Sequence, residues 1–236
     1  MKILLLADIH SNWQALSVIK EEFDICLFAG DLVDYGTDPI PCINWIREYS
    51  TTAIRGNHDH AVSQRVSPKT GNGFRKLAAA ARPYHWKVLQ SAHMDYLTAM
   101  PVTRQVTLES GSFYLVHGSP RDPLDEYIGP DARVWVHRLE NIHADYVIVG
   151  HSHIPFHLDL GRTQLINPGS VGQPRDGDPR LSYALIDNGR IELKRCEYDI
   201  AAAVDQMRES GIDGEAMELA EYVLKTGNPP SSANGG

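Results

Sequence analysis

The chain has 236 residues, and its 22 Lys and Arg against 30 Asp and Glu give a formal net charge of −8 and a pI near 5.7. This acidic balance excludes a general electrostatic attraction to nucleic acid or to an anionic membrane. The length fits one large domain or two small ones, and we expect a single domain over residues 1–226.

The beginning of the chain lacks the pattern of a targeting or membrane segment. The apolar run Ile3–Ala7 is interrupted by Asp8, and it is much shorter than the roughly 20 residues of a membrane helix. We therefore expect a cytoplasmic protein. The three cysteines, Cys26, Cys42 and Cys196, are odd in number and far apart, which indicates buried free thiols and no disulfide framework or zinc–thiolate site.

Hydrophobic periodicity predicts alternating strands and helices in the first part of the chain. The expected elements are strands at Lys2–Ala7, Ile25–Ala29 and Thr51–Arg55, and helices at Asn12–Glu22 and Asp38–Tyr49. The next segment, Ser63–Gly73, is polar and contains Pro and Gly, so it predicts a mobile loop. A helix is expected over Phe74–Ala99 and ends before Pro101.

The second part of the chain is richer in strand-like runs. The expected strands are Arg104–Leu108, Phe113–Val116, Tyr146–Val149, Thr163–Ile166, Leu181–Asp187 and Arg190–Glu197. Helices are expected near Asp131–Ile142, at Ile200–Ser210 and at Glu215–Lys225. Residues 227–236 hold nothing to bury, which predicts a disordered tail.

Five short motifs follow five of the expected strands directly. They are Asp8-Ile9-His10, Gly30-Asp31-Leu32-Val33-Asp34, Gly56-Asn57-His58-Asp59, His117-Gly118 and Gly150-His151-Ser152-His153. Open α/β sheets keep their ligands at the carboxyl ends of the strands, so these motifs should meet at one edge. Each motif alone is weak evidence, but the series predicts several metal ligands in one place.

The ligand types indicate a two-metal site for phosphoester hydrolysis. A metal pair about 3.5–4 Å apart clamps a phosphoryl group and lowers the pKa of a bound water, so that a metal-bound hydroxide can attack near neutral pH. Asp31 is the expected bridge between the ions. Asp8, His10 and one histidine of the pair His151 and His153 would complete one metal.

Asn57, His117 and the other histidine of that pair would complete the second metal. On an extended segment, side chains two positions apart face the same way, so His151 and His153 could serve two ions from one strand end. Imidazole with carboxylate suits manganese, iron, zinc, cobalt or nickel better than calcium, and the sequence does not choose among them. Two divalent ions would leave a net positive charge that attracts a phosphate.

His58 is the expected general acid, because it adjoins Asn57 and an imidazole can protonate a leaving alkoxide at ordinary pH. Asp34 would orient the ring of His58, and Asp59 would brace the surrounding loop. Among the other histidines, His60 follows Asp59 and could line the mouth of the site. The aromatic cluster Tyr84, His85 and Trp86 is expected in the core, although such a cluster can also stack a nucleobase.

The complete series from Asp8 to His153 resembles the signature of the calcineurin-like metallophosphoesterases. The resemblance covers almost the whole chain and implies a four-layer α-β-β-α sandwich. It implies one metal on Asp8, His10, Asp31 and His153, the other on Asp31, Asn57, His117 and His151, and pairing of Asp34 with His58. Residues 117–127 and 167–179 are similar to a prokaryotic branch related to diadenosine tetraphosphate hydrolases.

One position departs from the phosphoprotein phosphatases of that superfamily. They carry an Arg directly after Gly-Asp-x-x-Asp, and this chain has Tyr35 there, which tells against protein phosphatase activity. Arg55, Arg121 and Arg175 are the candidate substrate-binding residues instead, since Arg can hold a phosphate with a forked pair of bonds. A purely structural role for each remains the alternative.

The leading interpretation is a metal-dependent hydrolase of phosphomonoesters, phosphodiesters or a dinucleoside polyphosphate, with a small phosphate ester as its partner. A non-catalytic scaffold of the same fold, as in the retromer scaffold subunit, and a nuclease are the alternatives. The intact ligand set argues against the scaffold, and the acidic charge offers no support for nucleic-acid binding. Arg65 and Lys69 make Ser63–Gly73 a candidate substrate lid, against the alternative of a solvated surface loop.

Overall fold

The first apolar run forms β1 (Lys2–Leu6), whose residues Ile3 to Leu6 are fully buried. The computed structural model describes residues 1–68 and 71–229. The strand β1 is central in a five-stranded sheet of order β10-β9-β1-β2-β3, with β2 (Ile25–Phe28), β3 (Thr52–Ala53), β9 (Leu181–Asp187) and β10 (Arg190–Cys196). The strands β1, β2 and β3 are parallel, so their carboxyl ends share one edge.

A second five-stranded sheet has the order β4-β5-β6-β8-β7. Its strands are β4 (Thr103–Leu108), β5 (Gly111–Val116), β6 (Tyr146–Ile148), β7 (Phe156–Asp159) and β8 (Gln164–Asn167). The strands β5, β6 and β8 are parallel, whereas β4 and β7 run antiparallel to their neighbours. This sheet therefore also has a shared carboxyl edge.

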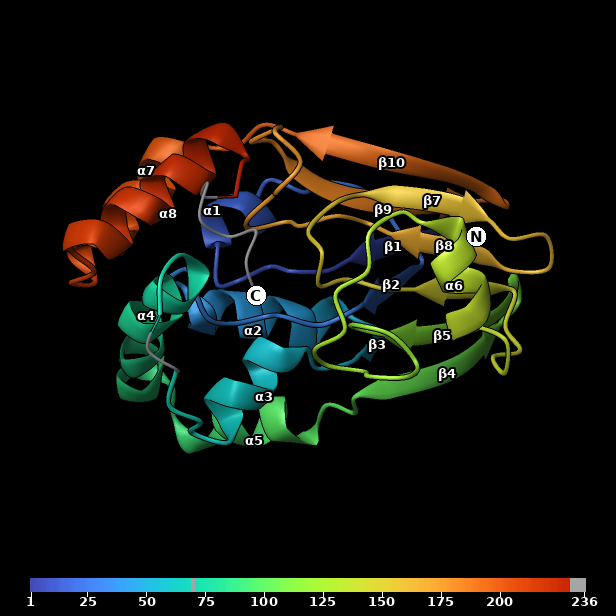
Figure 1. The fold of residues 1–236 in the computed structure, drawn as a ribbon, viewed down its shortest axis with the longest axis horizontal. Helices are drawn as coiled ribbons and strands as arrows, with labels where there is room; N and C mark the ends of the chain where they lie inside the picture. Colours follow the sequence, from blue (N-terminus) through green and yellow to red (C-terminus); the bar gives the residue numbers. More distant parts are fainter. Residues whose placement is uncertain (69–70, 230–236) are drawn as a thin grey trace.

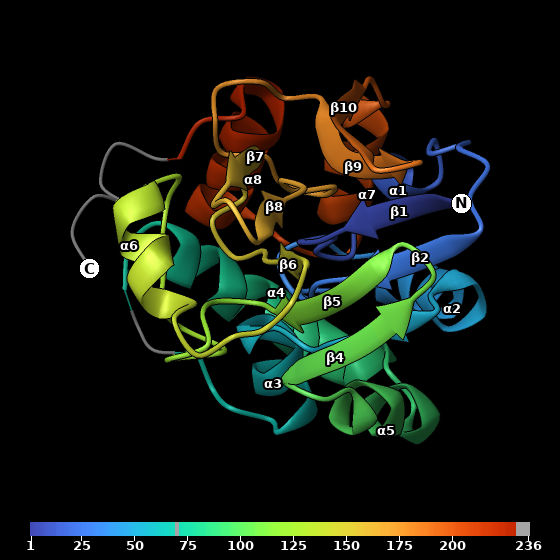
Figure 2. The same cartoon turned by 90° about the vertical axis from the view of Figure 1, so that its right-hand side faces the viewer.

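Two layers of helices cover the paired sheets, which gives the four-layer α-β-β-α sandwich that the sequence predicts. Residues such as Leu5, Leu27 and Leu115 pack between the sheets. The outer face of the first sheet is covered by α1 (Trp13–Leu16), α2 (Pro39–Tyr49), α3 (Asn57–Ser63) and α5 (Ser91–Ala99). The outer face of the second sheet is covered by α6 (Ala132–Arg138) (Figure 2).

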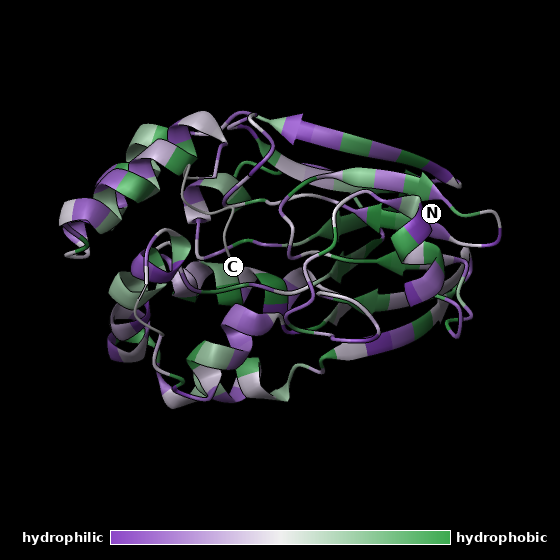
Figure 3. Ribbon diagram, viewed as in Figure 1, coloured by the Kyte–Doolittle hydropathy of each residue, from purple (hydrophilic) through white to green (hydrophobic). Residues whose placement is uncertain are grey.

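Three further helices pack together at the motif-bearing end of the sheets (Figure 1). They are α4 (Phe74–Val88), α7 (Ile200–Glu209) and α8 (Gly214–Thr226). The ring of Tyr35, which belongs to the loop after β2, is buried in the same cluster. Figure 3 shows that hydrophobic residues dominate β1 and β2, while the edge strand β10 carries several hydrophilic ones.

Several predicted boundaries are wrong for identifiable reasons. The helix expected over Asn12–Glu22 is only α1, capped by the Asn12 side chain, because a turn at Ser17 ends it. The single helix expected over Phe74–Ala99 is two, since the extended Leu89 and Gln90 separate α4 from α5. The helix α3 and the strand β7 are absent from the predicted elements. Cys196 is only half-buried, unlike Cys26 and Cys42.

The disordered tail was predicted over residues 227–236, and this predicted start is too early in the chain. Gly227 ends α8 with a left-handed φ of 65°, and its carbonyl accepts a hydrogen bond from Gly177 N–H at 2.8 Å. Residues 230–236 of the expected tail, and Lys69 of the expected lid, lie outside the described residues. Within 1–68 and 71–229, no helix combines the length and apolar character that a bilayer span requires.

Candidate metal centre

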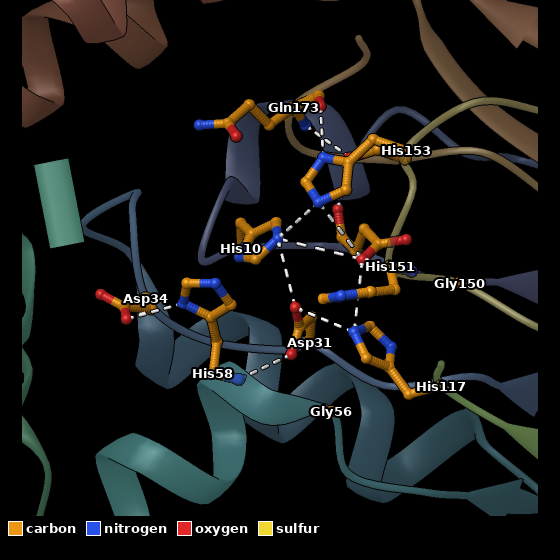
Figure 4. A network of polar contacts seen from close by, with 12 residues as sticks. His10, Asp31, Asp34, Gly56, His58, His117, Gly150, His151, His153 and Gln173 are labelled. Carbon is orange, nitrogen blue, oxygen red and sulfur yellow. Dashed lines mark hydrogen bonds and ion pairs between the residues drawn. The ribbon is translucent and has the colours of Figure 1, made fainter. Parts of the chain in front are cut away.

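The five motifs follow the carboxyl ends of β1, β2, β3, β5 and β6, which lie at the same end of the two facing sheets. Their backbone is unusual, because most of the non-glycine residues with left-handed φ angles belong to these loops. They are Asp8, His10, Ser11, Asp31, Asp34, Tyr35, His151 and His153. Such conformations persist only where the surroundings hold them, and they cluster at functional sites. Tight turns thus aim the side chains of His10, Asp31, His151 and His153 into one small volume (Figure 4).

Backbone carbonyls fix the orientation of three histidine rings. The Nδ1 atoms of His10, His117 and His153 lie 3.2 Å from Val33 O, 2.8 Å from Ala29 O and 2.6 Å from Gln173 O, respectively. A ring that donates its Nδ1 proton to a carbonyl presents Nε2 as a lone pair, which is the arrangement that metal-binding histidines use. In the neutral rings, all three Nε2 atoms would therefore present a lone pair to the shared volume.

The first set of side chains, which we call the Asp8 group, consists of Asp8, His10, Asp31 and His153. All four are buried, and one donor atom of each lies within 4.8 Å of the others. The Nε2 atoms of His10 and His153 are 3.1 Å apart, although both carry lone pairs. Two nitrogens that each lie about 2.0–2.1 Å from one ion have about this separation, so a cation shared by the two rings would account for the contact.

The second set, the His117 group, consists of Asp31, His117 and His151. His117 Nε2 lies 3.1 Å from Asp31 Oδ2, and the ring centroids of His117 and His151 are 5.0 Å apart. Asn57 begins α3, and the N–H of the adjacent His58 donates to Asp31 Oδ1 at 2.9 Å. Asp31 belongs to both groups, which is the position that a bridging carboxylate requires.

The extended backbone that was predicted for the Gly-His-x-His motif is wrong. His151 and His153 have left-handed φ angles of 66° and 59°, so the segment is not extended. Their rings consequently point into different groups, His153 beside His10 and His151 beside His117. The turn, and not strand alternation, lets neighbouring histidines serve two positions.

Four potential metal-ligand atoms of these residues are buried and satisfy no hydrogen-bond geometry with the described residues, although two of them, on Asp31 and His117, lie 3.1 Å apart. They are Asp8 Oδ2, Asp31 Oδ2, Asn57 Oδ1 and His117 Nε2. Buried polar atoms normally find partners, because leaving one unpaired costs about 1–3 kcal/mol. Each can offer a lone pair to a cation, His117 after its ring loses a proton, so the residues fit a metal site.

The electrostatics of the groups also favour added positive charge. Burial lowers the pKa of His117, but the carboxylates of Asp31 and Asp8 outweigh burial and raise that pKa to about 9. Burial raises the pKa of Asp8, with a further contribution from Asp31. Burial lowers the pKa values of His10 and His153, which keeps their rings neutral. Protons on His117 and Asp8 thus supply charge that a metal ion would replace.

His58 lies beside both groups and is held by Asp34. Its Nδ1 is 2.8 Å from Asp34 Oδ2, and its ring centroid is 5.1 Å from that of His10. Burial lowers the pKa of His58, but the Asp31 and Asp34 carboxylates outweigh burial and raise it. The two carboxylates therefore shift the equilibrium of the His58 ring toward its protonated form.

Asp59 braces the loop that carries Asp31. Its two carboxylate oxygens accept hydrogen bonds from the backbone N–H groups of Asp31, Leu32, Val33 and Gly56 at 2.8–3.1 Å. Gly56 must lack a side chain, because a Cβ there would lie 2.1 Å from Asp31 Oδ1. The Gly-Asn-His-Asp motif thus fixes Asp31 as well as presenting Asn57 and His58.

The three candidate arginines lie in different surroundings. The guanidinium carbon of Arg175 is 3.8 Å from the Phe74 ring centroid and 5.8 Å from that of Tyr35, which itself packs on His58. Arg55 donates to Thr98 O at 3.2 Å, which directs it toward α5. Arg121 is exposed. Only Arg175 is shown to contact aromatic side chains that pack at the site.

Sequence reasoning missed Arg82, Gln173 and Tyr127. Arg82 of α4 binds Asp34, the Gln173 carbonyl holds His153, and the Tyr127 hydroxyl donates to Ser152 O at 2.9 Å with its ring near His151. Tyr127 and Gln173 lie within the segments 117–127 and 167–179, but the resemblance of those segments assigned them no role, and Arg82 lies in no motif. His60 lies in α3, and its buried Nδ1 has no partner within residues 1–68 and 71–229; His85 is fully buried, as expected of a core residue.

Residues 1–190 match the profile of the calcineurin-like phosphoesterase superfamily domain. An uncharacterised protein of Methanocaldococcus jannaschii is 33% identical over 230 residues, which cover 87% of this chain and 91% of that protein. The phosphodiesterase YfcE of Escherichia coli K12 is 25% identical over 215 residues, which cover 82% of this chain and 91% of YfcE.

A solved structure agrees with these sequence matches. The crystal structure of a metallophosphoesterase from Sphaerobacter thermophilus superposes with a TM-score of 0.82 at 32% identity, covering 96% of this chain and 99% of that one. The likeness therefore includes α7 and α8, which lie beyond the residues that the family profile matches.

Proposed function

This chain belongs to the calcineurin-like phosphoesterase superfamily, and on that premise we propose that it hydrolyses phosphomonoesters or phosphodiesters at a two-metal site. Family membership makes it a metal-dependent phosphoester hydrolase. The observation that carries the rest is the pair of buried ligand groups that share Asp31 and leave acceptor atoms without partners. A nucleotide or a dinucleoside polyphosphate falls within the substrate class that we propose.

We assign one transition-metal ion to the Asp8 group and a second to the His117 group completed by Asn57. Manganese, iron, zinc, cobalt and nickel all suit this mixture of imidazole, carboxylate and amide donors. When bound, such ions would neutralise charge on the phosphoryl group and make a water molecule acidic enough to act near neutral pH. The carbonyl-fixed histidine tautomers support this assignment.

We assign proton transfer to His58. Its Nδ1 is engaged by Asp34, so Nε2 is left to donate a proton to the leaving oxygen of the substrate. Asp34 fixes the tautomer and stabilises the charged ring, as a carboxylate does in other Asp–His pairs. His58 is outside both ligand groups, so its role is separable from metal binding.

We assign phosphate recognition first to Arg175. Its guanidinium stacks on Phe74, and its Nη2 donates to Gln173 Oε1 at 2.8 Å, while Nε is buried with no partner in the part of the chain that the structure describes. A stacked guanidinium with a free donor is suited to a phosphate oxygen. The proposal that Arg55 and Arg121 also contact the substrate rests on their places in the sequence.

The two alternatives, a non-catalytic scaffold and a nuclease, predict other features than those of this chain. A scaffold needs no proton donor, whereas this chain keeps the Asp34–His58 pair beside an intact ligand set. A nuclease needs a basic path for the nucleic-acid backbone, and the net charge of −8 offers no general attraction. A small phosphate ester is the substrate that the site supports best.

An activity panel tests the proposal. The full chain, stripped of metal and reconstituted with each candidate metal in turn, is assayed on p-nitrophenyl phosphate, bis-p-nitrophenyl phosphate, cyclic nucleotides and diadenosine tetraphosphate. We expect hydrolysis of at least one of them, lost on chelation and abolished by Asp31→Asn. Absence of hydrolysis with every metal would favour the scaffold, and cleavage of DNA or RNA alone would favour the nuclease.

A further inference from the structure

The Asp34 carboxylate that holds His58 has a second partner. Arg82 projects from α4, and its Nε and Nη2 atoms lie 3.0 and 2.6 Å from Asp34 Oδ2, the same oxygen that lies 2.8 Å from His58 Nδ1. The Arg82 side chain is 8% exposed and that of Asp34 is fully buried. A single oxygen thus joins a guanidinium to the proposed proton donor.

The guanidinium is anchored on its remaining side as well. Arg82 Nη1 donates to Val66 O at 3.0 Å, in the segment that follows α3. Asp34 Oδ1 accepts from Tyr35 N–H at 3.1 Å. Because each end of this ion pair has further partners, neither side chain can turn without breaking several bonds. Arg82 therefore fixes the carboxylate in one orientation.

The same helix also holds the backbone of this loop. Asp34 N–H donates to His85 Nε2 at 3.2 Å, and His85 Nδ1 donates to Ala81 O at 2.9 Å within α4. Asp34 and Tyr35 have left-handed φ angles of 74° and 60°, so this turn needs outside support. The helix α4 supplies that support through both Arg82 and His85.

We propose that Arg82 is a positioning residue for proton transfer, which fixes the Asp34 carboxylate and, through it, the ring of His58. The inference rests on the role proposed above for His58. Without Arg82, the buried carboxylate would lose two of its donors and its counter-charge, and it could rotate or admit water. The His58 ring would then leave its reactive orientation, and small displacements of a catalytic group are costly.

Kinetics of matched variants test this role in the metal-reconstituted chain. The assay uses the p-nitrophenyl and phenyl esters of the ester class that the wild type hydrolyses, because the phenyl leaving group needs more help from a proton donor. For Arg82→Ala we expect kcat on the phenyl ester to fall about 10²-fold, with a much smaller loss on the p-nitrophenyl ester. KM and metal content should stay near wild-type values, and Arg82→Lys should restore part of the loss.

Trp86→Phe is the matched control. Trp86 lies on the same helix, and its Nε1 donates to Val62 O at 3.0 Å, so this variant loosens α4 without touching Asp34. It should keep the wild-type ratio of rates on the two esters. In a His58→Ala background, Arg82→Ala should lower kcat on the phenyl ester by less than about threefold, because the two residues act as one unit. Equal loss on both esters, or additive losses in the double variant, would overturn the proposal.

A readout without turnover separates this proposal from the proposed function. We expect the His58 Nδ1 proton, observed by NMR in ¹⁵N-labelled protein, to be protected from solvent exchange in the wild type and in Trp86→Phe. It should exchange at least about tenfold faster in Arg82→Ala, since the carboxylate is no longer fixed. Unchanged protection in Arg82→Ala contradicts the role of Arg82 even if the chain hydrolyses no ester.

Discussion

At the scale of single residues, we expect the loss of Asp59 to lower stability strongly. Asp59→Ala would leave the buried N–H groups of Asp31, Leu32, Val33 and Gly56 without their acceptor. Because each buried unpaired donor costs about 1–3 kcal/mol before relaxation, we expect a loss of about 3–5 kcal/mol in the free energy of unfolding. Urea titration of the metal-free chain measures it.

Asp145→Ala serves as the control for this variant. Asp145 also accepts hydrogen bonds from backbone and side chain, at Ser112, but in an exposed position where water can replace it. Asp145→Ala should therefore lower the free energy of unfolding clearly less than Asp59→Ala. A change below about 1 kcal/mol for Asp59→Ala would show that the brace is dispensable.

The pKa of His117 determines how metal binding depends on pH. The carboxylates raise this pKa to about 9, and His117 must lose its proton before Nε2 can bind a metal. Below pH 9, His117 therefore carries a proton that the metal must displace. The affinity for the metal should consequently rise steadily from pH 6 to pH 8. Calorimetry in buffers of different ionisation enthalpy should detect proton release at pH 7. A flat affinity without proton release would contradict the assignment of His117.

His58→Ala tests the proposed proton donor. The variant should keep its metals, because His58 is outside both ligand groups, and it should slow turnover of poor leaving groups by about 10²–10⁴-fold. Esters of p-nitrophenol need less protonation and should be affected less. Steady-state kinetics on both kinds of ester, with metal analysis of the same samples, provide the comparison. Equal losses would leave His58 with a positioning role only.

At the scale of elements, the end of α8 depends on a single glycine. A Cβ at Gly227 would lie 2.6 Å from the Asp178 carbonyl carbon, in addition to the strain of its left-handed φ of 65°. Gly211 after α7 also has a positive φ, 91°, but a Cβ there would meet no described atom within 4 Å. We expect about 3 kcal/mol of destabilisation for Gly227→Ala and about 1 kcal/mol for Gly211→Ala. Equal thermal shifts would mean that α8 does not depend on this contact.

Local patterns predicted most elements and misjudged where helices stop. The strand β9 matches its predicted bounds, because a run that is apolar apart from Ser182 and buried on both faces stops clearly at the exposed Asp187. The helix α1 is much shorter than predicted, and helical spacing alone did not mark the turn at Ser17 that ends it. The strand β7 was missed because its exposed half, with His157 and Asp159, lacks an apolar signal.

At the scale of the whole molecule, the convergence of the motifs follows from parallel strands in two facing sheets. The sequence could predict that edge from five strand ends, since each strand type and its following motif are local features. It could not predict Arg82, which stands 48 positions from Asp34 and meets it only through the packing of α4. Nor could it predict the turn that separates His151 from His153, because that turn uses φ angles typical of glycine.

The central claim is that Asp31 bridges two metal ions. Crystals of the chain grown with manganese, and an anomalous difference map from them, test this directly. We predict two peaks about 3.5–4 Å apart, one among Asp8, His10 and His153 and the other among Asn57, His117 and His151, with the Asp31 carboxylate in contact with both. A single peak, or two peaks of which Asp31 touches only one, would contradict the account.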